Sequence, residues 1–408
     1  MRAWGEYDQE CSRCNVRTNR LAENSAMIAG VEVSCFATLA MVEAEWLALE
    51  AQAACTYYQS LAWCKAWTET IGKTSAVKPF ILIGKSKSND AQFLLPFQIR
   101  KRYGLSILEW LCQPENNYGH GIFKHGLANM NWQDWFNENI LHVLALLPHH
   151  DVAALCNMPE TVFDRHSPLS ALHRFASANQ SFVTHLEPNF EALLQKKRAP
   201  RSISKIRRRD ERLAEAGALE IEILSSSTQS TAALSEMLLH KSLQLSEIGV
   251  DSFAIQNLIG FFDGLLQSKI GELHLFRLQQ SGKTISALLG ASYANTFWLL
   301  VLSMSPDAPL QFSPGDYILR KSIAWACENK LQTYDFSTGH SHYKEIWVDK
   351  DIQLYDYFAA KTLKGFPLAA VYVFFFTAKR IVKNTPAFKN FLFGARKFLR
   401  RKTRRISD

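Results

Sequence analysis

The chain has 408 residues, which is enough for two or three domains, or for one large domain with a substantial core. Apolar residues make up 47% and charged residues 21%, which excludes a disordered, collagenous or disulfide-scaffold protein. The formal net charge is +8, so a nucleic-acid or membrane partner has to be considered.

The first half of the chain predicts an alternation of strands and helices. Apolar alternation indicates strands, and apolar spacing of three to four residues indicates helices. The predicted strands are 31–39, 78–84, 92–100, 107–112, 152–156 and 181–186, and the predicted helices are 42–54, 57–71, 132–147 and 167–178.

The second half repeats this order of elements. A basic helical region at 188–216, interrupted at Pro200, leads into a strand at 218–224. Helices at 232–248 and 253–267 precede three strands, 272–279, 284–294 and 296–304, which form a predicted antiparallel meander. A helix at 315–329 and a strand at 333–336 follow. This order is typical of an acyltransferase-type α/β unit, and no short sequence repeat accompanies it.

The positive charge is confined to two segments. Residues 358–408 contain 13 Lys or Arg and one acid, whereas the first 357 residues contain 33 bases and 37 acids. Residues 196–212 contain nine bases and two acids. The body of the protein is therefore slightly acidic and shows no DNA-recognition motif, so we do not expect nucleic acid as a partner.

The cysteine pattern and the apolar segments suggest a cytoplasmic protein. Most of the eight cysteines have apolar neighbours, as reduced core thiols do, and the single pair Cys11 and Cys14 does not make a metal site. Residues 1–30 are expected to form a disordered leader without a secretory signal. The most apolar stretch, 365–378, would span about 21 Å as a helix, so we expect no transmembrane segment.

Residues 297–319 predict a strand, a loop and the start of a helix. Ser313 and Pro314 are typical of a helix start, and Gly315 would let a ligand approach the backbone. Free N–H groups at a helix start suit a pyrophosphate, although the same residues could simply begin a helix. Together with Tyr334-Asp-Phe-Ser-Thr-Gly339 and Tyr343-Lys-Glu-Ile-Trp347, the segment Ser313-Pro-Gly-Asp-Tyr-Ile-Leu319 resembles the CelD/BcsL-type acetyltransferases, a Fem-related branch of the GNAT superfamily.

The first half agrees with this resemblance. Its matching segments are Glu45-Trp46, Tyr58-Gln-Ser-Leu-Ala-Trp63, Leu94-Leu-Pro-Phe97 and Asn117-Tyr-Gly119, and the family's basic helix is matched by residues 201–209. The resemblance implies an α/β fold of tandem GNAT-like units, each a mixed, largely antiparallel sheet flanked by helices. The expected domains are 31–187 and 188–357, followed by a basic amphipathic helical tail at 358–408.

The resemblance also implies direct transfer of an acetyl or acyl group from acyl-CoA to an amine or hydroxyl of a sugar, amine or lipid-linked acceptor. No metal is expected. The predicted catalytic residues are Asp335, Tyr343, Lys344 and His240, and the predicted donor-binding residues are Ser313, Gly315, Asp316 and Arg208. Each has a structural alternative: Asp335 could cap a loop, and His240 could be a satisfied helical histidine.

Two basic segments leave alternatives open. Residues 196–212 could be a solvated helix face, a clamp for donor phosphates or a contact for polyanionic acceptors. Residues 378–405 interleave aromatic and aliphatic residues with eleven Lys or Arg, as a helix on an anionic membrane surface does, although such a helix could also pack on the acidic body. We therefore expect an envelope-glycan acyltransferase that is cytoplasmic and peripheral on the inner membrane face. The alternatives are a Fem-like aminoacyl-tRNA-dependent transferase and a non-catalytic scaffold.

Overall fold

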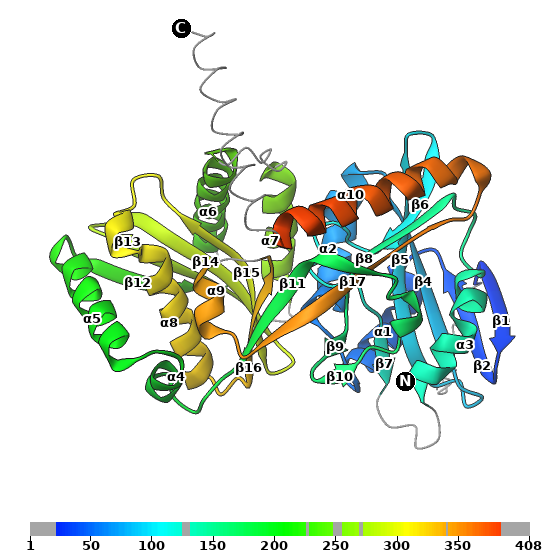
Figure 1. Cartoon of the computed structure of the whole chain (residues 1–408), viewed down its shortest axis with the longest axis horizontal. Coiled ribbons are helices and arrows are strands. Elements are labelled where there is room, and N and C mark those ends of the chain that lie inside the picture. The colour runs from blue at the N-terminus through cyan, green and yellow to red at the C-terminus, as the bar shows by residue number, and fades with distance from the viewer. Residues whose placement is uncertain are drawn as a thin grey trace, which may run out of the picture.

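The computed structural model describes residues 22–124, 131–225, 228–247, 255–268, 272–339 and 342–384 (Figure 1). Residues 1–21 of the predicted disordered leader 1–30 and the tail beyond residue 384 lie outside the described residues, so most of the predicted amphipathic segment 378–405 does too. The end of the predicted leader is not disordered, because Asn24–Ile28 form a strand that pairs with Val31–Cys35.

The strands of the first half are β1 (Asn24–Ile28), β2 (Val31–Phe36), β3 (Ala53–Ala54), β4 (Lys78–Lys85), β5 (Ala91–Arg102), β6 (Leu105–Trp110), β7 (Ile122–Lys124), β8 (Val152–Pro159), β9 (Thr161–Val162), β10 (Arg165–His166) and β11 (Phe175–His185). Its helices are α1 (Glu43–Glu50), α2 (Leu61–Trp67) and α3 (Trp132–Leu144). The strands of the second half are β12 (Leu219–Leu224), β13 (Glu272–Gln280), β14 (Lys283–Tyr293), β15 (Thr296–Met304), β16 (Thr333–Thr338) and β17 (Lys350–Ala360). Its helices are α4 (Phe190–Lys197), α5 (Pro200–Glu215), α6 (Thr228–Glu247), α7 (Ile255–Gln267), α8 (Pro314–Glu328), α9 (His342–Trp347) and α10 (Phe366–Asn384).

The two halves share one continuous sheet, in the order β1-β2-β4-β5-β6-β8-β17-β11-β16-β15-β14-β13-β12. Each half contains one parallel pair, β6 with β8 and β15 with β16, while the other pairings are antiparallel. The predicted fold, an α/β chain of two units with mixed, largely antiparallel sheets and flanking helices, is therefore confirmed.

The halves exchange strands at the centre of the sheet. β11 follows β8 along the chain but pairs with β16 of the second half, and β17 follows β16 but pairs with β8 of the first half. β11 and β17 also pair with each other. Because three strand pairings join the halves by backbone hydrogen bonds, the relative placement of the two halves is fixed by the sheet itself.

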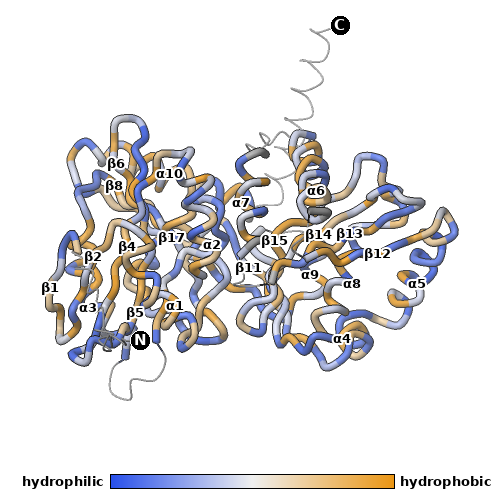
Figure 2. Tube along the Cα trace, turned by 180° about the vertical axis from the view of Figure 1, so that it is seen from behind, coloured by the Kyte–Doolittle hydropathy of each residue, from blue (hydrophilic) through white to orange (hydrophobic). Residues whose placement is uncertain are grey.

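The largest core cluster also spans both halves. Trp63 of α2 meets Phe261 of α7 at a ring-centroid distance of 4.8 Å in a perpendicular arrangement, and both rings are buried. Figure 2 shows hydrophobic residues concentrated along central strands such as β4, β5 and β14, which is where a sheet covered by helices on its faces buries its side chains. Burial of such large side chains stabilises the junction by about 1.5–3 kcal/mol each.

Two predictions from the sequence are wrong. The helix expected at 167–178 is a short turn at Ser170–Leu172 followed by β11, because tertiary pairing of Phe175 with Asp356 overrides the local apolar spacing. The apolar helix is also longer than predicted, because the stretch 365–378 has 14 residues whereas α10 has 19 residues. Within the described part of the chain, Leu363–Lys383 is the one segment that is long and apolar enough to cross a membrane.

Candidate active site

A cavity opens where the parallel strands β15 and β16 separate. The two strands pair only from Thr296 to Trp298 and from Thr333 to Asp335, and then diverge. The cavity has a volume of about 450 Å³ and is closed by side chains from both halves of the chain. Its polar lining residues are Tyr58, Glu115, Asn117, Lys241, Ser337, Thr338, Tyr343 and Lys344.

Lys344, on α9, is the most perturbed cation of this cavity. Its Nζ donates hydrogen bonds to the backbone carbonyls of Ser337 at 3.2 Å and Thr338 at 2.9 Å, and the residue is 5% exposed. Burial lowers the pKa of Lys344 to about 8, although Asp335 opposes the shift. A lysine with this pKa exchanges its proton near neutral pH, which an exposed lysine does not.

Lys241, on α6, is a half-buried lysine that also lines the cavity. Its Nζ donates a hydrogen bond to the carbonyl of Leu302 at 2.9 Å, and burial lowers its pKa. The sequence analysis did not select it, although it is the immediate neighbour of the predicted residue His240. His240 itself does not line the cavity, and its Nδ1 is buried without a hydrogen-bond partner among the described residues.

Asp335, on β16, is held by residues from both halves. It accepts hydrogen bonds of 2.6 Å from the Tyr118 hydroxyl and from the backbone N–H of Ser337, and burial raises the pKa of Asp335 to about 6. Tyr118 in turn contacts Ser181 of β11. Asp335 lines a smaller cavity of about 60 Å³ and not the one that contains Lys344. These hydrogen bonds indicate that Asp335 holds the C-terminal end of β16 in place.

Residues of the first half also form the side of this cavity that is next to Ser337. The Tyr58 hydroxyl lies 2.8 Å from Ser337 Oγ and accepts a hydrogen bond of 2.7 Å from Asn117 Nδ2. Asn117 also accepts a hydrogen bond of 2.6 Å from Thr338 Oγ1. The segments 58–63 and 117–119 were recognised in the sequence, but only the fold shows that they complete a cavity of the second half.

Tyr343, the other predicted residue on α9, also lines this cavity, and burial raises its pKa to about 12. Its hydroxyl therefore stays protonated at physiological pH. The structure thus brings Tyr343 and Lys344 together in one cavity.

The predicted donor-binding residues lie at the start of α8. Ser313 has a left-handed backbone, with φ of 51°, and accepts backbone hydrogen bonds from Asp316 and Tyr317. Pro314 has no N–H, so among these first residues the Gly315 N–H is the one for which the described chain shows no acceptor. A Cβ added to Gly315 would meet Met304 Sδ at 3.1 Å, so close packing against β15 by itself favours glycine here.

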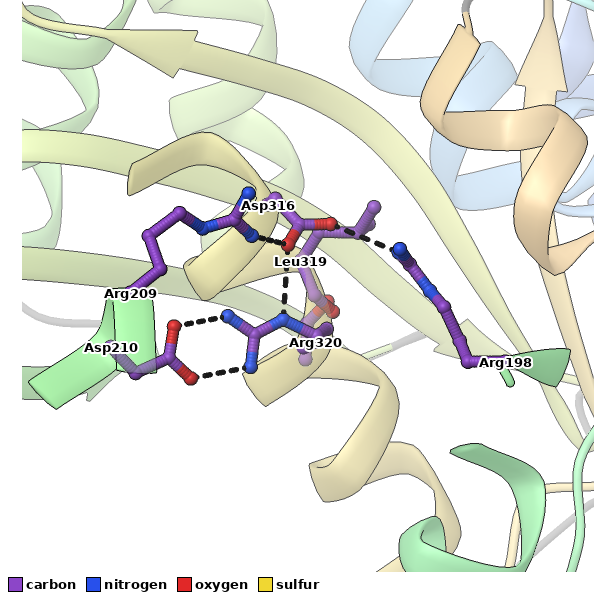
Figure 3. Close-up of polar contacts among 7 residues, drawn as sticks. Arg198, Arg209, Asp210, Asp316, Leu319 and Arg320 are labelled. Atoms are coloured by element: carbon purple, nitrogen blue, oxygen red, sulfur yellow. Dashed lines mark hydrogen bonds and ion pairs between the residues drawn. The ribbon is translucent and has the colours of Figure 1, made fainter. Parts of the chain in front are cut away.

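Asp316 sits in a cluster of arginines (Figure 3). Its carboxylate accepts hydrogen bonds from Arg209, from Arg198 at 3.4 Å and from Arg320 Nε at 3.1 Å. Arg320 also forks onto Asp210 with two bonds of 2.7 and 2.8 Å. Three cations thus meet two carboxylates beside the helix start.

The predicted Arg208 does not take part in this cluster. It is exposed, whereas its neighbour Arg209 and the half-buried Arg198 face α8. The amphipathic α5 turns Ile203, Ile206 and Leu213 inward, and this orientation of the helix brings Arg209 and not Arg208 to α8. Arg198 lies before α5, at the end of α4. Among the described residues no group of three or more His, Cys, Asp or Glu could hold a metal ion.

Comparison with known proteins assigns the second half of the chain. Residues 200–345 match the family model described as an acetyltransferase (GNAT) domain. This range extends from α5 into α9 and contains the diverging strands, Lys241 and Lys344. No curated protein sequence matches the chain.

Solved structures are similar to nearly the whole chain. FemX has 13% sequence identity and a TM-score of 0.51, and the similarity covers 81% of this chain and 97% of FemX. A tandem GNAT protein from the clavulanic acid biosynthesis pathway has 8% identity and a TM-score of 0.43, and the similarity covers 81% of this chain and 98% of that protein. L-PGS from Bacillus licheniformis has 13% identity, covers 79% and 96%, and has a TM-score of 0.44. At these identities the similarity to FemX concerns the fold.

Proposed function

We propose that this chain, an acyltransferase of the GNAT superfamily, moves an acetyl or acyl group from acyl-CoA directly to an amine or hydroxyl of its acceptor. The observation that carries the proposal is the cavity of about 450 Å³ at the divergence of β15 and β16, two strands of the range that matches the GNAT domain. The buried Lys344 and the half-buried Lys241, both with lowered pKa values, line it. Titratable groups perturbed by burial in a cavity are typical of catalytic sites.

Lys344 is the proposed general base. A neutral lysine has two N–H groups and one lone pair, and the carbonyls of Ser337 and Thr338 accept two N–H groups. The lone pair is then left for the acceptor. Because the pKa of Lys344 is lowered to about 8, a useful fraction of the amine is neutral near physiological pH.

The proposed reaction needs no covalent enzyme intermediate. The acceptor nitrogen or oxygen attacks the thioester carbonyl and transfers its proton to Lys344 Nζ; the C–S bond then breaks and the departing thiolate takes that proton. Tyr343, whose pKa is raised to about 12, keeps its hydroxyl proton and can donate a hydrogen bond to the oxyanion. The buried cysteines have no part in this scheme.

The donor's pyrophosphate is proposed to lie at the start of α8. The Gly315 N–H points from the first turn, and the three arginines of the Asp316 cluster exceed its two carboxylates by one positive charge. A helix N-terminus with a net cationic side-chain group suits an anion. Ser313 shapes the turn, and Arg198 and Arg209 take the place expected for Arg208.

The acceptor is proposed to belong to exopolysaccharide or other envelope-glycan synthesis, as the resemblance to CelD/BcsL-type acetyltransferases implies. It would be a sugar, an amine or a lipid-linked molecule. The matching location is the cytoplasm, with the protein peripheral on the inner membrane face. These statements rest on the motifs around Ser313, Asp335 and Tyr343 and on the basic end of the chain.

Calorimetric titration with acetyl-CoA and with charged tRNA tests the donor. We expect acetyl-CoA to bind and charged tRNA not to bind. Binding of charged tRNA alone would support a Fem-like transferase, for which the exposed arginines of α5 provide a basic surface. If neither ligand binds, the chain is a scaffold and the proposed function is wrong.

A further inference from the structure

The helix α10 is fixed to the body of the protein along one side. It packs on β8, β11 and β17, so it lies across the centre of the sheet (Figure 1). Tyr372 and Phe376 meet the Phe358 ring of β17 at centroid distances of 5.6 and 5.0 Å, and Leu368 packs in the same cluster. The inner side of α10 is thus an ordinary core contact.

The outer side of α10 is apolar as well. Phe366, Val371, Phe374, Phe375 and Ile381 are 67%, 58%, 76%, 59% and 57% exposed. The sequence contains no charged residue between positions 365 and 378. A helix with water on its outer side normally carries polar residues there, and a contiguous apolar face of this kind marks an interaction surface.

A groove runs along the same helix. It has a volume of about 710 Å³ and is lined by apolar side chains with a single threonine, Thr377. Its walls include Phe358 of β17 and Phe366, Val373 and Phe374 of α10. Hydrocarbon chains fit a groove of this composition, whereas a polar ligand would find almost no partner in it.

The charge around this face is positive. Lys364 precedes α10, Lys379, Arg380 and Lys383 lie in its last turns, and the helix contains no acidic residue. Lys364 pairs with Asp151, and Arg380 and Lys383 donate hydrogen bonds to Ala176 and Asn179 of β11, so Lys379 is the exposed cation of the helix itself. The following residues, 385–408, add eight Lys or Arg and one acid in sequence. Two copies of this segment would repel each other, whereas anionic lipid headgroups attract it.

We propose that the outer face of α10 inserts into the surface of an anionic bilayer and docks the protein on it. The helix lies in the membrane–water interface and does not cross the membrane, because its inner side packs against β8, β11 and β17. The aromatic face enters the acyl boundary, and the basic residues contact the headgroups.

Co-sedimentation of the full chain with vesicles tests this proposal without any reference to the transferase activity. The wild type should bind vesicles of phosphatidylcholine with phosphatidylglycerol, and bind vesicles of phosphatidylcholine alone more weakly. The double variant F374Q/F375Q should partition at least roughly tenfold less, because two large side chains no longer enter the hydrocarbon boundary. Leu141→Gln, at a 58% exposed position on α3, is the matched control and should bind like the wild type.

Four outcomes would overturn the proposal. The first is a wild type that stays in the supernatant with anionic vesicles, and the second is a double variant that binds as well as the wild type. The third is found by sedimentation velocity: the wild type is a dimer, F374Q/F375Q is a monomer, and neither protein binds vesicles. The outer face of α10 would then join two copies of the chain. Release of bound wild type by alkaline carbonate supports a surface helix, and retention shows a spanning one and contradicts the proposal.

Discussion

Replacing Lys344 by methionine or arginine tests the proposed base directly. Methionine keeps the length of the side chain but has neither an N–H group nor a basic lone pair, whereas arginine keeps a cation that is not deprotonated in proteins. General-base catalysis contributes about 10²–10⁴-fold to a rate. We therefore expect both variants to lose about 10²-fold or more in kcat, while the affinity for acetyl-CoA stays near that of the wild type.

The pH dependence follows from the pKa of Lys344. Since the pKa is lowered to about 8, the fraction of neutral amine rises about tenfold from pH 6 to pH 7 and levels off above about pH 9. The wild-type kcat/KM should rise with pH in the same way, and the residual rate of Lys344→Met should not. Release of CoA thiol from acetyl-CoA in the presence of an amine acceptor is the assay.

The fold has to be checked in parallel. Removing the ammonium leaves the carbonyls of Ser337 and Thr338 without these donors, which costs about 1–3 kcal/mol of unfolding free energy per buried group. Circular dichroism and the melting temperature distinguish this loss from a catalytic one. The base assignment is refuted if Lys344→Arg keeps most of the activity, or if the wild-type rate falls as the pH rises through 8.

Three further predictions concern stability and donor binding. Burial raises the pKa of Asp335 from 3.8 to about 6, so the folded state binds more protons than the unfolded state between these two values. The free energy of unfolding of the wild type should therefore fall by up to about 3 kcal/mol as the pH rises from 4 to 6. D335N should remove this pH dependence in urea unfolding, and a variant with the same pH dependence as the wild type would contradict the prediction. Arg320→Leu should cost about 3–5 kcal/mol, because it leaves the Asp210 carboxylate without its buried cation, while Asp316 keeps Arg198 and Arg209. Arg207→Leu, at an exposed position, should change the denaturation midpoint little. Gly315→Ala should fold, because the Met304 side chain can move, and should weaken acetyl-CoA binding in calorimetry; unchanged affinity places the pyrophosphate elsewhere.

Much of the fold could be predicted because local patterns agree with the tertiary structure. The meander β13–β15, the helix α8 and the strand β16 fall close to their predicted ranges, since their apolar periods match their burial. The strand β17 and the helix α9 were missed. In β17 the residues before Leu354 are mostly polar, and the strand exists because β8 and β11 flank it on both sides.

The candidate site was predictable only in part. Tyr343 and Lys344 were selected from a motif, and the structure places both at the cavity. Lys241 was missed because a lysine in an amphipathic helix carries no signal of burial, and its lowered pKa arises from the elements packed around it. Arg209 and Arg198 could not be separated from Arg208 without knowing how α5 rests on its neighbours.

The sequence by itself determined the class of the protein, because periodicity, helix starts and motif order are local properties of a chain. It also located the excess positive charge in residues 196–212 and beyond residue 358. Only the tertiary structure decided that β11 and β17 are exchanged between the halves, so that Tyr58 and Asn117 complete a cavity of the second half. Only the structure also separated the inner from the outer face of α10, since both are apolar and packing alone distinguishes them.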